Sequence, residues 1–498
     1  MKPVFLWKVL ALLVVLSMLF TACAPAVEQP AEQPAEQPVA GEPEPSQGGK
    51  TITWATLAGF YTDWAKQLAK DYEEKSGNTV VIVEMDLPTM FEKEVLDMRG
   101  GTGTYDIVTW NVSWKSDWAN NGFLYPLDDY IQRDNDYFQV EDINAALLAT
   151  GGQWGGKTYG LPYYTFTPGL IYRCDLFENP DEMAAFEAKY GYKLDIPQTY
   201  DQMADIAEFF RRSPGTTLKG EALDKDLYGV GLMAGRYGHI FDEINTIAWT
   251  YGGDVVNDDG TPGVNQKAYL DAVHMYVDEL LPYAPPGSLS GGYDFVISQF
   301  NTGLVAMTGP MYLDQWPNAV KVETNVPGSE ACMAPLPGGG KTWAGAFSIG
   351  MTKSSKNPDD AWEFLKYITG PEAQRKFAEG GGSTTRMSIL NDKEFYSTRR
   401  ETAGHFPVLV QILDHASSCW QTNFIYTTSA ANIYEESPAW LSGAASKEQG
   451  VEEAMNGFAE KIQEFCGGGA CELYLDGVNQ PEGECAPPPF DRSAQLRK

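Results

Sequence analysis

The stretch "TITWATLAGFYTDWAKQLAKDYEEKSGNTVVIVEM", residues 51–85, places a strand, a helix and a second strand in direct succession. Residues 51–55 and 80–85 have the composition of short β-strands, and residues 64–75 have the apolar spacing of an amphipathic helix that ends at Gly77. A third strand is expected at residues 106–109, after the glycines of "GGTGTYD". Strands that alternate with helices predict an α/β fold with parallel sheets.

Loops at the carboxyl ends of such strands are the usual place for a ligand. The strands at residues 51–55 and 106–109 therefore direct attention to the loops 56–61 and 110–114. The roughly 450 residues after the N-terminal region are too many for one compact core, and they are enough for two or three domains.

The N-terminus has the pattern of a secretory signal. Lys2 and Lys8 precede an apolar run at residues 9–20, and small residues lead to Cys23. An apolar run of about 12 residues is too short to cross a bilayer and fits a signal peptide. The small residues before Cys23 resemble a bacterial lipobox, although Phe20 stands where leucine is usual. We expect a signal peptide at residues 1–22 and a lipidated Cys23; an ordinary cleaved signal without lipid is the alternative.

Residues 23–50 contain the repeat "VEQPAEQPAEQP" followed by "EPEP". Proline at every fourth position prevents a helix, and the segment has too little apolar surface to fold. We expect a disordered, semi-rigid spacer that extends by roughly 3 Å per residue. Such a spacer would hold the folded part of the chain away from a membrane.

The chain is strongly acidic, with a formal net charge of −31. This charge argues against binding to nucleic acid or to anionic membrane surfaces, and it suits solubility outside the cell. Besides Cys23 there are six cysteines, an even number in an exported chain, so up to three disulfides are expected. Fifteen connectivities are possible, and at least one local pair is expected in the tail. The six are Cys174, Cys332, Cys419, Cys466, Cys471 and Cys485.

Nine motifs follow one another in a familiar order. They are "DYEEKSGNTVVIV", "YDIVTWN", "GFLYPLDDYI", "YGLPYYTFTPGLIYRCDLF", "WTYGGDVVNDDG", "FNTGLVAMTGP", "APLPGGG", "KSSKNPDDAWEFLKYITGPEAQRKFAEGGGSTTR" and "SKEQGVEEAMNGFAEKI". In this order they resemble the family 1 extracellular solute-binding proteins, which are the receptors of ABC importers. The resemblance covers residues 51 to about 465, and the cysteine-rich tail 466–498 lies outside it.

The resemblance implies an α/β, two-lobe periplasmic-binding-protein-like fold of type II, with a hinge of crossing strands between the lobes. The first lobe is expected to hold residues 51–165 and 333–372, and the second lobe residues 166–332 and 373–465. It also implies a monomer without a cofactor. Together with the lipobox at Cys23, it places the protein at the extracytoplasmic face of a bacterial membrane, held there by a lipid anchor. There it would bind a carbohydrate between the lobes and deliver it to an ABC permease.

A carbohydrate site needs aromatic rings for the C–H faces of sugars, and polar side chains that bind pairs of hydroxyl groups. The resemblance places such residues in the loops expected around the ligand. From the first lobe they are Phe60, Trp110, Asn111, Tyr163, Gly345 and Phe347; from the second lobe they are Trp249, Asp294, Met311 and Arg386. The structural alternatives are core packing for the aromatic residues, favoured for Trp249, and a surface salt bridge for Arg386.

Two of these positions depart from the family pattern. The segment "AGAFSIG" resembles a Gly-Gly-Trp loop, with Phe347 in the place of the tryptophan, so the indole N–H donor is lost. Met311 stands where the family often has tryptophan, and Tyr312 or Trp316 are the candidates to supply the missing ring.

Several other motifs predict no function. "PLPGGGKT" has Pro335 where a phosphate-binding loop requires glycine. "NVS" at Asn111 matches a glycosylation acceptor by chance, since the lipobox implies a bacterium. "NDDGTPG", residues 257–263, lacks the remaining spacing of a calcium loop and predicts a hairpin turn. The four histidines lie scattered, without metal-ligand spacing.

Two other classes of protein are alternatives to the receptor. A lipid-anchored glycoside hydrolase needs two carboxylates about 5 to 9 Å apart across one sugar bond, and among 67 Asp and Glu residues some pair can always be nominated. No nucleophile elbow or Ser/His/Asp signature stands out. An adhesin would predict repeated β modules, and the only repeat is the spacer. A binding protein of an ABC importer is therefore the preferred hypothesis, with the hydrolase as the alternative.

Overall fold

A computed structural model describes residues 49–419, 423–475 and 489–498, and these residues belong to one unit, Gln47–Lys498. The expected signal peptide, Cys23, nearly all of the expected spacer, and Cys485 lie outside the described residues, as does the side chain of Cys419. No helix in the described part combines the length and the apolar character needed to cross a membrane.

The first lobe is built on a five-stranded sheet with the order β2-β1-β3-β14-β6. Its strands are β1 (Thr51–Leu57), β2 (Thr79–Met85), β3 (Ile107–Asn111), β6 (Leu161–Thr165) and β14 (Ala346–Met351). β1 runs parallel to β2 and to β3, as the βαβ pattern of residues 51–85 predicts. β14 runs antiparallel to both β3 and β6. The sheet is therefore mixed rather than purely parallel, because β14 enters it from the other lobe.

Local signals explain where the first helices begin and end. α2 (Phe60–Ser76) buries Leu68 and Tyr72 against the sheet and ends at Gly77, whose φ of 74° lies in the left-handed region that favours glycine. α3 (Leu87–Gly100) begins at Asp86, whose carboxylate accepts the N–H of Thr89. The other helices around this sheet are α4 (Lys115–Asn120), α5 (Asp128–Phe138), α6 (Ala145–Gly152), α16 (Pro358–Ile368), α17 (Pro371–Glu379) and α18 (Met387–Leu390). A two-stranded ribbon, β4 (Gln153–Trp154) with β5 (Lys157–Thr158), lies next to α6.

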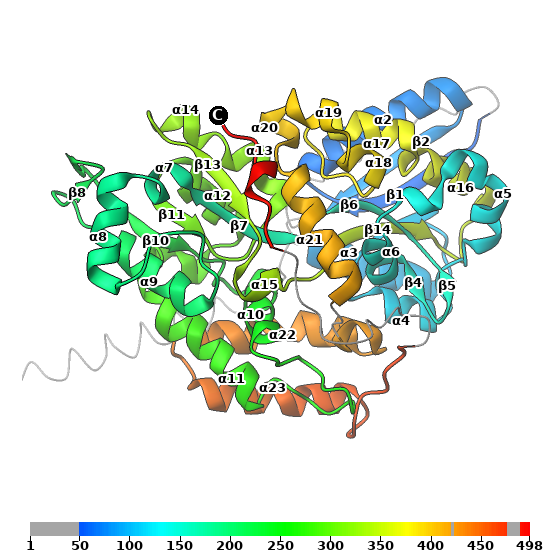
Figure 1. Cartoon of the computed structure of the whole chain (residues 1–498). Coiled ribbons are helices and arrows are strands. Elements are labelled where there is room, and N and C mark those ends of the chain that lie inside the picture. The colour runs from blue at the N-terminus through cyan, green and yellow to red at the C-terminus, as the bar shows by residue number, and fades with distance from the viewer. Residues whose placement is uncertain (1–48, 420–422, 476–488) are drawn as a thin grey trace, which may run out of the picture. The chain divides into compact units, whose positions relative to one another are not determined.

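The second lobe is built on a sheet with the order β10-β11-β7-β12, and β13 also pairs with β7. The strands are β7 (Pro168–Arg173), β10 (Tyr228–Gly231), β11 (Val305–Thr308), β12 (Met311–Tyr312) and β13 (Ala331–Ala334). β7 is antiparallel to β11, β12 and β13, so this sheet is mixed as well. Its helices include α7 (Cys174–Phe177), α8 (Pro180–Tyr190), α9 (Tyr200–Phe210), α10 (Gly238–Thr250), α11 (Lys267–His274), α12 (Tyr293–Asn301), α13 (Trp316–Ala319) and α14 (Val322–Asn325). A short ribbon, β8 (Thr217–Leu218) with β9 (Glu221–Ala222), extends from this lobe (Figure 1).

Two segments of chain cross directly between the sheets. The first leads from β6 through Phe166 and Thr167 into β7, and the second leads from β13 through residues 335–345, which include α15 (Pro337–Gly340), into β14. The carbonyl of Gly345 accepts the N–H of Phe166 at 3.0 Å and the hydroxyl of Thr165 at 2.8 Å. A Cβ at Gly345 would lie 2.8 Å from the ring of Phe166. Glycine is needed there because the crossing segments lie so close together.

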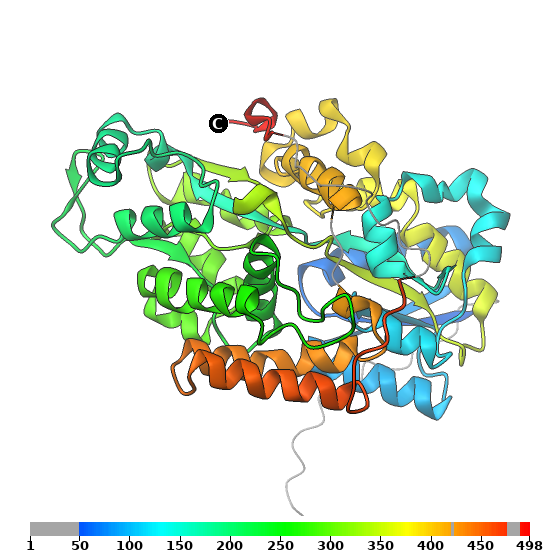
Figure 2. The same ribbon diagram turned by 60° about the horizontal axis from the view of Figure 1, so that its bottom comes forward.

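Two long helices near the C-terminus connect both lobes. α22 (Ala430–Ala445) and α23 (Val451–Phe465) pack side by side, and α22 contacts α10 of the second lobe and α4 of the first (Figures 1 and 2). The hydroxyl of Ser116 donates to the carbonyl of Thr427 at 2.7 Å, just before α22. Pro438 lies inside α22 and has no N–H for the carbonyl of Tyr434; the hydroxyl of Ser437 donates to that carbonyl instead, at 2.8 Å.

The segment after α16 differs from its expected place in the second lobe. α17 packs against α2 and α16 of the first lobe, because it buries Ala373, Phe377 and Ala378 on one face. The chain then passes through α19 (Lys393–Ser397) to α20 (Arg400–Ala403), which packs on α13 of the second lobe, and α21 (Phe406–Cys419) contacts α6 and α18. Residues 371–390 thus lie with the first lobe.

Two disulfides confirm that the cysteines pair. Cys174 pairs with Cys332, 158 residues away, and Cys466 pairs with Cys471 immediately after α23. The second pair is the local one expected in the tail.

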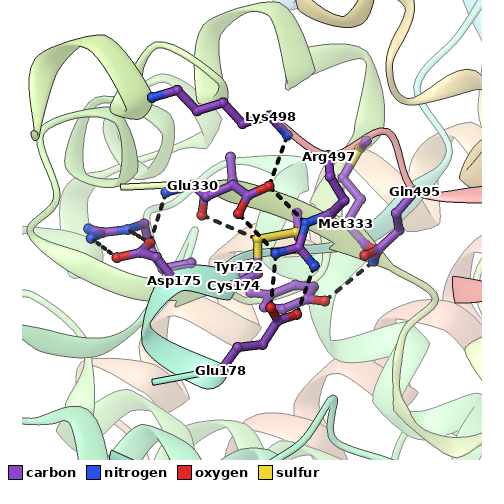
Figure 3. Close-up of a disulfide and its surroundings, with 12 residues drawn as sticks. Tyr172, Cys174, Asp175, Glu178, Glu330, Met333, Gln495, Arg497 and Lys498 are labelled. Atoms are coloured by element: carbon purple, nitrogen blue, oxygen red, sulfur yellow. Dashed lines mark hydrogen bonds and ion pairs between the residues drawn. A yellow bond between two sulfur atoms is a disulfide. The ribbon is translucent and has the colours of Figure 1, made fainter. Parts of the chain in front are cut away.

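The described end of the tail is held on the second lobe beside the Cys174–Cys332 disulfide (Figure 3). Arg497 forms ion pairs with Glu178 at 2.8 Å and with Glu330 at 2.7 Å. The amide of Gln495 donates to the carbonyl of Met333 in β13. The end of the chain therefore adds to the packing of the second lobe.

Candidate ligand-binding cleft

A cavity of about 440 Å³ lies where the two lobes, the crossing segments and α22 meet. This volume is in the usual range for sites that hold a small molecule. The lining residues from the first lobe and the crossing segments are Leu57, Ala58, Tyr61, Leu87, Pro88, Asn111, Tyr164, Phe166 and Phe347. Those from the second lobe are Arg236, Tyr237, Gly238, His239, Asp242, Tyr293, Tyr312, Asp314 and Gln315, and α22 adds Tyr434, Glu435, Glu436, Pro438 and Ala439. We refer to this cavity as the cleft.

A continuous series of aromatic rings crosses the cleft from one lobe to the other. The rings of Tyr61 and Tyr164 are stacked with their centroids 3.8 Å apart, and Tyr164 lies 5.4 Å from Phe347. Phe166 lies 5.1 Å from Phe347 and 5.5 Å from Tyr312 of the second lobe. These rings give the cleft an apolar surface with flat faces, which suits the C–H faces of a sugar ring.

The series of rings ends at His239 on α10. Its ring centroid lies 5.9 Å from that of Tyr312 and 5.3 Å from that of Tyr293. Burial lowers the pKa of His239 to about 4, so its imidazole is neutral at neutral pH. Its Nδ1 is buried and finds no hydrogen-bond partner among the described residues. This atom lies beside Gly292, where an added Cβ would come within 2.8 Å of it.

Two buried carboxyl groups face the same part of the cleft. Asp242 on α10 accepts a hydrogen bond at 2.5 Å from the hydroxyl of Tyr312, and Asp314 accepts one at 3.0 Å from the amide of Gln315. Burial raises the pKa of Asp242 well above its usual range and raises that of Asp314 to about 7. In both residues the Oδ1 atom is buried and has no partner in the described part of the chain. Each carboxyl group therefore has one buried oxygen whose hydrogen-bonding capacity is unused within the described residues.

Of the residues expected from the sequence, Asn111 and Phe347 line the cleft. They lie directly opposite each other in neighbouring strands, Asn111 at the end of β3 and Phe347 in β14. The Oδ1 of Asn111 accepts the N–H of Ser113 at 3.1 Å, which fixes the orientation of the amide. Phe60 lies beside the cleft, 46% exposed, with its ring 5.6 Å from that of Tyr61.

Four of the other expected residues are packed into the protein core. Trp110 is fully buried and donates its indole N–H to the carbonyl of Gly151 at 2.8 Å. Tyr163 lies against Phe377, with ring centroids 5.4 Å apart. Met311 is fully buried. Trp249 is buried and donates its indole N–H to Asp254 at 3.2 Å. Core packing is the alternative that the sequence favours for this residue.

Arg386 does not line the cleft. It is buried in the first lobe, where it joins separate segments of the chain by hydrogen bonds and an ion pair. Its guanidinium is fully buried and donates to the carbonyl of Thr369 at 2.8 Å and to that of Phe138 at 2.8 Å. It also forms an ion pair with Asp142 at 3.4 Å. Asp294 is exposed in the first turn of α12, and Gly345 lies in the crossing segment.

Several cleft residues were missed by a single position. Tyr61, Tyr164, Tyr293 and Tyr312 line the cleft, and each is the neighbour of an expected residue: Phe60, Tyr163, Asp294 and Met311 respectively. Tyr164 and Tyr312 lie in the strands β6 and β12, where neighbouring side chains point to opposite faces, so a shift of one residue exchanges the core for the cleft. Tyr61 and Tyr293 lie in the first turns of the helices α2 and α12, where the neighbouring Phe60 and Asp294 are exposed. Tyr312 is also one of the two candidates for the ring that is missing at Met311. No motif pointed to Asp242, Asp314 or Glu435.

The motifs set aside on sequence grounds have structural roles. Residues 257–263 form a turn in which the N–H of Asn257 donates to the carbonyl of Thr261 at 2.8 Å. The glycines of "PLPGGGKT" belong to the second crossing segment. Among the described residues, one group has metal-ligand proximity, Cys174, Glu330 and Cys332. Its two sulfur atoms are joined in a disulfide and are not free to bind a metal.

The model of the family named "Bacterial extracellular solute-binding protein" matches residues 60–375, which is more than half of the chain. The chain belongs to this family. The order of motifs in the sequence had indicated the same family, and the two mixed α/β lobes agree with it.

Individual relatives of this solute-binding protein are distant. A binding protein of Brucella abortus is 26% identical over 67% of this chain and 75% of its own. A mannitol-binding protein of Pseudomonas aeruginosa is 22% identical over 68% and 73%. A solved structure of an ABC transporter solute-binding protein from Agrobacterium radiobacter K84 in complex with ribitol superposes with a TM-score of 0.71. It is 20% identical, and the match covers 84% of this chain and all of that one.

One buried carboxyl group of the solute-binding protein predicts how stability depends on pH. Glu243 accepts hydrogen bonds from the N–H of Met233 and the hydroxyl of Tyr276, and burial raises its pKa from 4.5 to about 8. The folded state holds the proton more tightly, so stability is fully present below pH 4.5 and is lost as the pH rises towards 8. Between pH 5 and pH 8 the wild type should lose roughly 2–4 kcal/mol more unfolding free energy than Glu243→Gln. Urea unfolding at both pH values measures this difference, and equal losses in the two proteins would contradict it.

Proposed function

We propose that this protein is the substrate-binding component of an ABC importer and that it takes a carbohydrate, a sugar, oligosaccharide or polyol, in the cleft. The observation that carries the proposal is the series of rings from Tyr61 to Tyr312 together with the unpartnered carboxyl oxygens of Asp242 and Asp314. Rings bind the C–H faces of a sugar, and carboxylates accept hydrogen bonds from its hydroxyl groups. Relatives that bind mannitol and ribitol support the same class of ligand.

The arrangement of the chain suggests how binding is linked to delivery. The two crossing segments, at Phe166–Thr167 and at residues 335–345, are the proposed hinge. A ligand that contacts the rings of both lobes binds the closed conformation more tightly than the open one and so shifts the population towards it. The permease would then recognise the closed receptor.

Ligand binding should raise the melting temperature. At a ligand concentration of 100 times Kd, binding stabilises the folded state by about 2.7 kcal/mol, which for a chain of this size is a rise of roughly 3 °C. A thermal-shift panel of monosaccharides, oligosaccharides, polyols, amino acids, peptides and metal salts tests the proposal. We expect at least one saccharide or polyol to produce the shift.

Matched variants locate the site. Phe347→Ala and Tyr237→Ala each remove a ring from the cleft and should weaken binding roughly tenfold. Tyr137→Ala removes a tyrosine of similar exposure on α5, away from the cleft, and should leave binding unchanged (exposure 44% against 54% for Tyr237). A shift with peptides or metal salts alone would exclude the carbohydrate. Shortened oligosaccharide products would favour the glycoside hydrolase instead.

We also propose that the protein is held at the extracytoplasmic face of a bacterial membrane by lipid on Cys23, with residues 24–50 as the spacer, and that it works as a monomer. The Cys23→Ser protein should then move from the membrane fraction to the soluble fraction, because the lipid is the expected anchor. Fractionation of cells without the permease measures this. Retention of the variant in the membrane would contradict a lipid anchor at Cys23.

A further inference from the structure

The cleft is unevenly charged. Its lining residues include four carboxyl groups, Asp242, Asp314, Glu435 and Glu436, and one cationic side chain, Arg236. Arg236 is exposed, whereas Asp242 and Asp314 are 3% and 8% exposed. Asp242 and Asp314 therefore occupy the enclosed part of the cleft, whereas Glu435 is exposed like Arg236 and Glu436 is half-buried.

Asp242 and Asp314 are not neutralised by the protein. Their hydrogen-bond donors are the hydroxyl of Tyr312 and the amide of Gln315, both of which are uncharged. In the same lobe, three other buried carboxylates have arginine partners, and the pairs are Asp175 with Arg173, Glu182 with Arg212 and Glu323 with Arg400. Glu243 and Asp254 lack a cation as well, but they do not line the cleft. Asp242 and Asp314, the two buried carboxyl groups that line the cleft, are thus left for a partner from outside.

The surroundings of these carboxyl groups favour a cation. The rings of Tyr312, Tyr293 and Phe166 lie in this part of the cleft. The ring centroid of Tyr312 is 6.3 Å from that of Tyr293 and 5.5 Å from that of Phe166. Aromatic faces attract positive charge. His239 adjoins the same rings and does not repel a cation, because burial keeps its pKa at about 4. The raised pKa values of both carboxyl groups have the same origin: burial without a cation makes ionisation unfavourable.

We propose that the solute carries a protonated amine, and that Asp242 and Asp314 bind this amine in the second-lobe half of the cleft beside Tyr312. The proposal rests on the carbohydrate function and narrows it to an amino sugar or amino polyol. A neutral sugar could also donate hydroxyl groups to the two carboxyl groups. A cation does more, because it favours the ionised form of a buried carboxyl group and compensates the charge, which a neutral sugar cannot do, and an anionic sugar would be repelled.

The test uses pairs of probes that differ only in the amine. D-glucamine is compared with D-sorbitol, and D-glucosamine with D-glucose and with N-acetyl-D-glucosamine, by calorimetry at pH 7. Because a hydrogen bond to a charged group is stronger than one to a hydroxyl, an amine probe should bind at least about tenfold more tightly than its hydroxyl partner. N-acetylation should remove that preference, because it removes the charge.

Three variants assign the preference to particular carboxyl groups. Asp242→Asn and Asp314→Asn keep the hydrogen bonds and remove the charge, so each should reduce the preference for the amine at least about threefold. Asp226→Asn, at an exposed ion pair with Arg211, makes the same change of net charge away from the cleft and should keep the preference.

The possible outcomes separate this inference from the proposed function. If the uncharged probes D-sorbitol and D-glucose bind as tightly as the amine probes or more tightly, the proposal of a protonated amine is overturned and the carbohydrate proposal stays intact. Putrescine, an amine without hydroxyl groups, is tested beside these probes. Binding of putrescine but of no amino sugar or amino polyol keeps the proposal of an amine and overturns that of a carbohydrate. Binding of none of the probes overturns both. A preference that survives in both cleft variants overturns the assignment to Asp242 and Asp314.

Discussion

The Arg386→Met variant is expected to lose about 3–5 kcal/mol of unfolding free energy, as when one partner of a buried charged pair is removed. The guanidinium of Arg386 satisfies the carbonyls of Phe138 and Thr369 and pairs with Asp142, and its side chain is fully buried. Methionine fills a similar space but donates no hydrogen bond, so buried carbonyls are left without partners. Denaturant unfolding measures the loss.

An exposed arginine provides the control for Arg386. Arg133→Met removes a side chain that is 51% exposed and pairs with Asp134, and it should lose less than about 1 kcal/mol. If Arg386→Met does not fold, Arg386→Lys, which keeps the charge with fewer donors, should fold with a smaller loss. Normal stability of Arg386→Met together with lost ligand binding would place Arg386 in the site and contradict its role as a structural tie.

Removal of the Cys174–Cys332 disulfide should have the second-largest effect. This disulfide closes a loop of 158 residues, and a cross-link that closes a long loop restricts the unfolded chain strongly. The double variant Cys174→Ser with Cys332→Ser should lose roughly 2–5 kcal/mol of unfolding free energy. Both cysteines are replaced together so that no free thiol remains.

The second disulfide offers a matched comparison. Cys466 and Cys471 are only 5 residues apart, so replacing both should lower the unfolding free energy by less than the loss of the first disulfide. Thermal and denaturant unfolding under oxidising conditions measure the two double variants side by side. Equal losses, or a larger loss for the short loop, would contradict the argument from loop length.

Much of the fold could be predicted from local sequence. The strands expected at residues 51–55, 80–85 and 106–109 are present as β1, β2 and β3, and the helix expected at residues 64–75 is the larger part of α2. Such elements follow from side-chain periodicity and from capping residues such as Gly77 at the end of α2. Both signals lie within a few residues of the element that they define. The parallel order of β1, β2 and β3 also follows, because βαβ units impose it. The antiparallel β7 and β14 do not, since their direction depends on crossings between lobes.

The sequence by itself determined the family. The order of motifs along nearly the whole folded chain is enough to identify it, and this order can be read without knowing where any side chain points. It also located the cleft to within one residue at four positions. Only the tertiary structure decided that Tyr164 rather than Tyr163, and Tyr312 rather than Met311, face the cleft. The face of a strand is fixed by the register of strands far away in the sequence, such as β14 against β6.

The remaining site residues depended on contacts between distant segments. Arg386 follows a glycine-rich stretch that looks exposed in the sequence, yet it is buried because α5 and α16 place their terminal carbonyls around it. Asp242 and Asp314 lie in different elements of the second lobe, and Glu435 lies on α22, which reaches the cleft because it packs on both lobes. Their convergence follows from packing between elements 70 or more residues apart in the sequence, and no local pattern in the sequence records it.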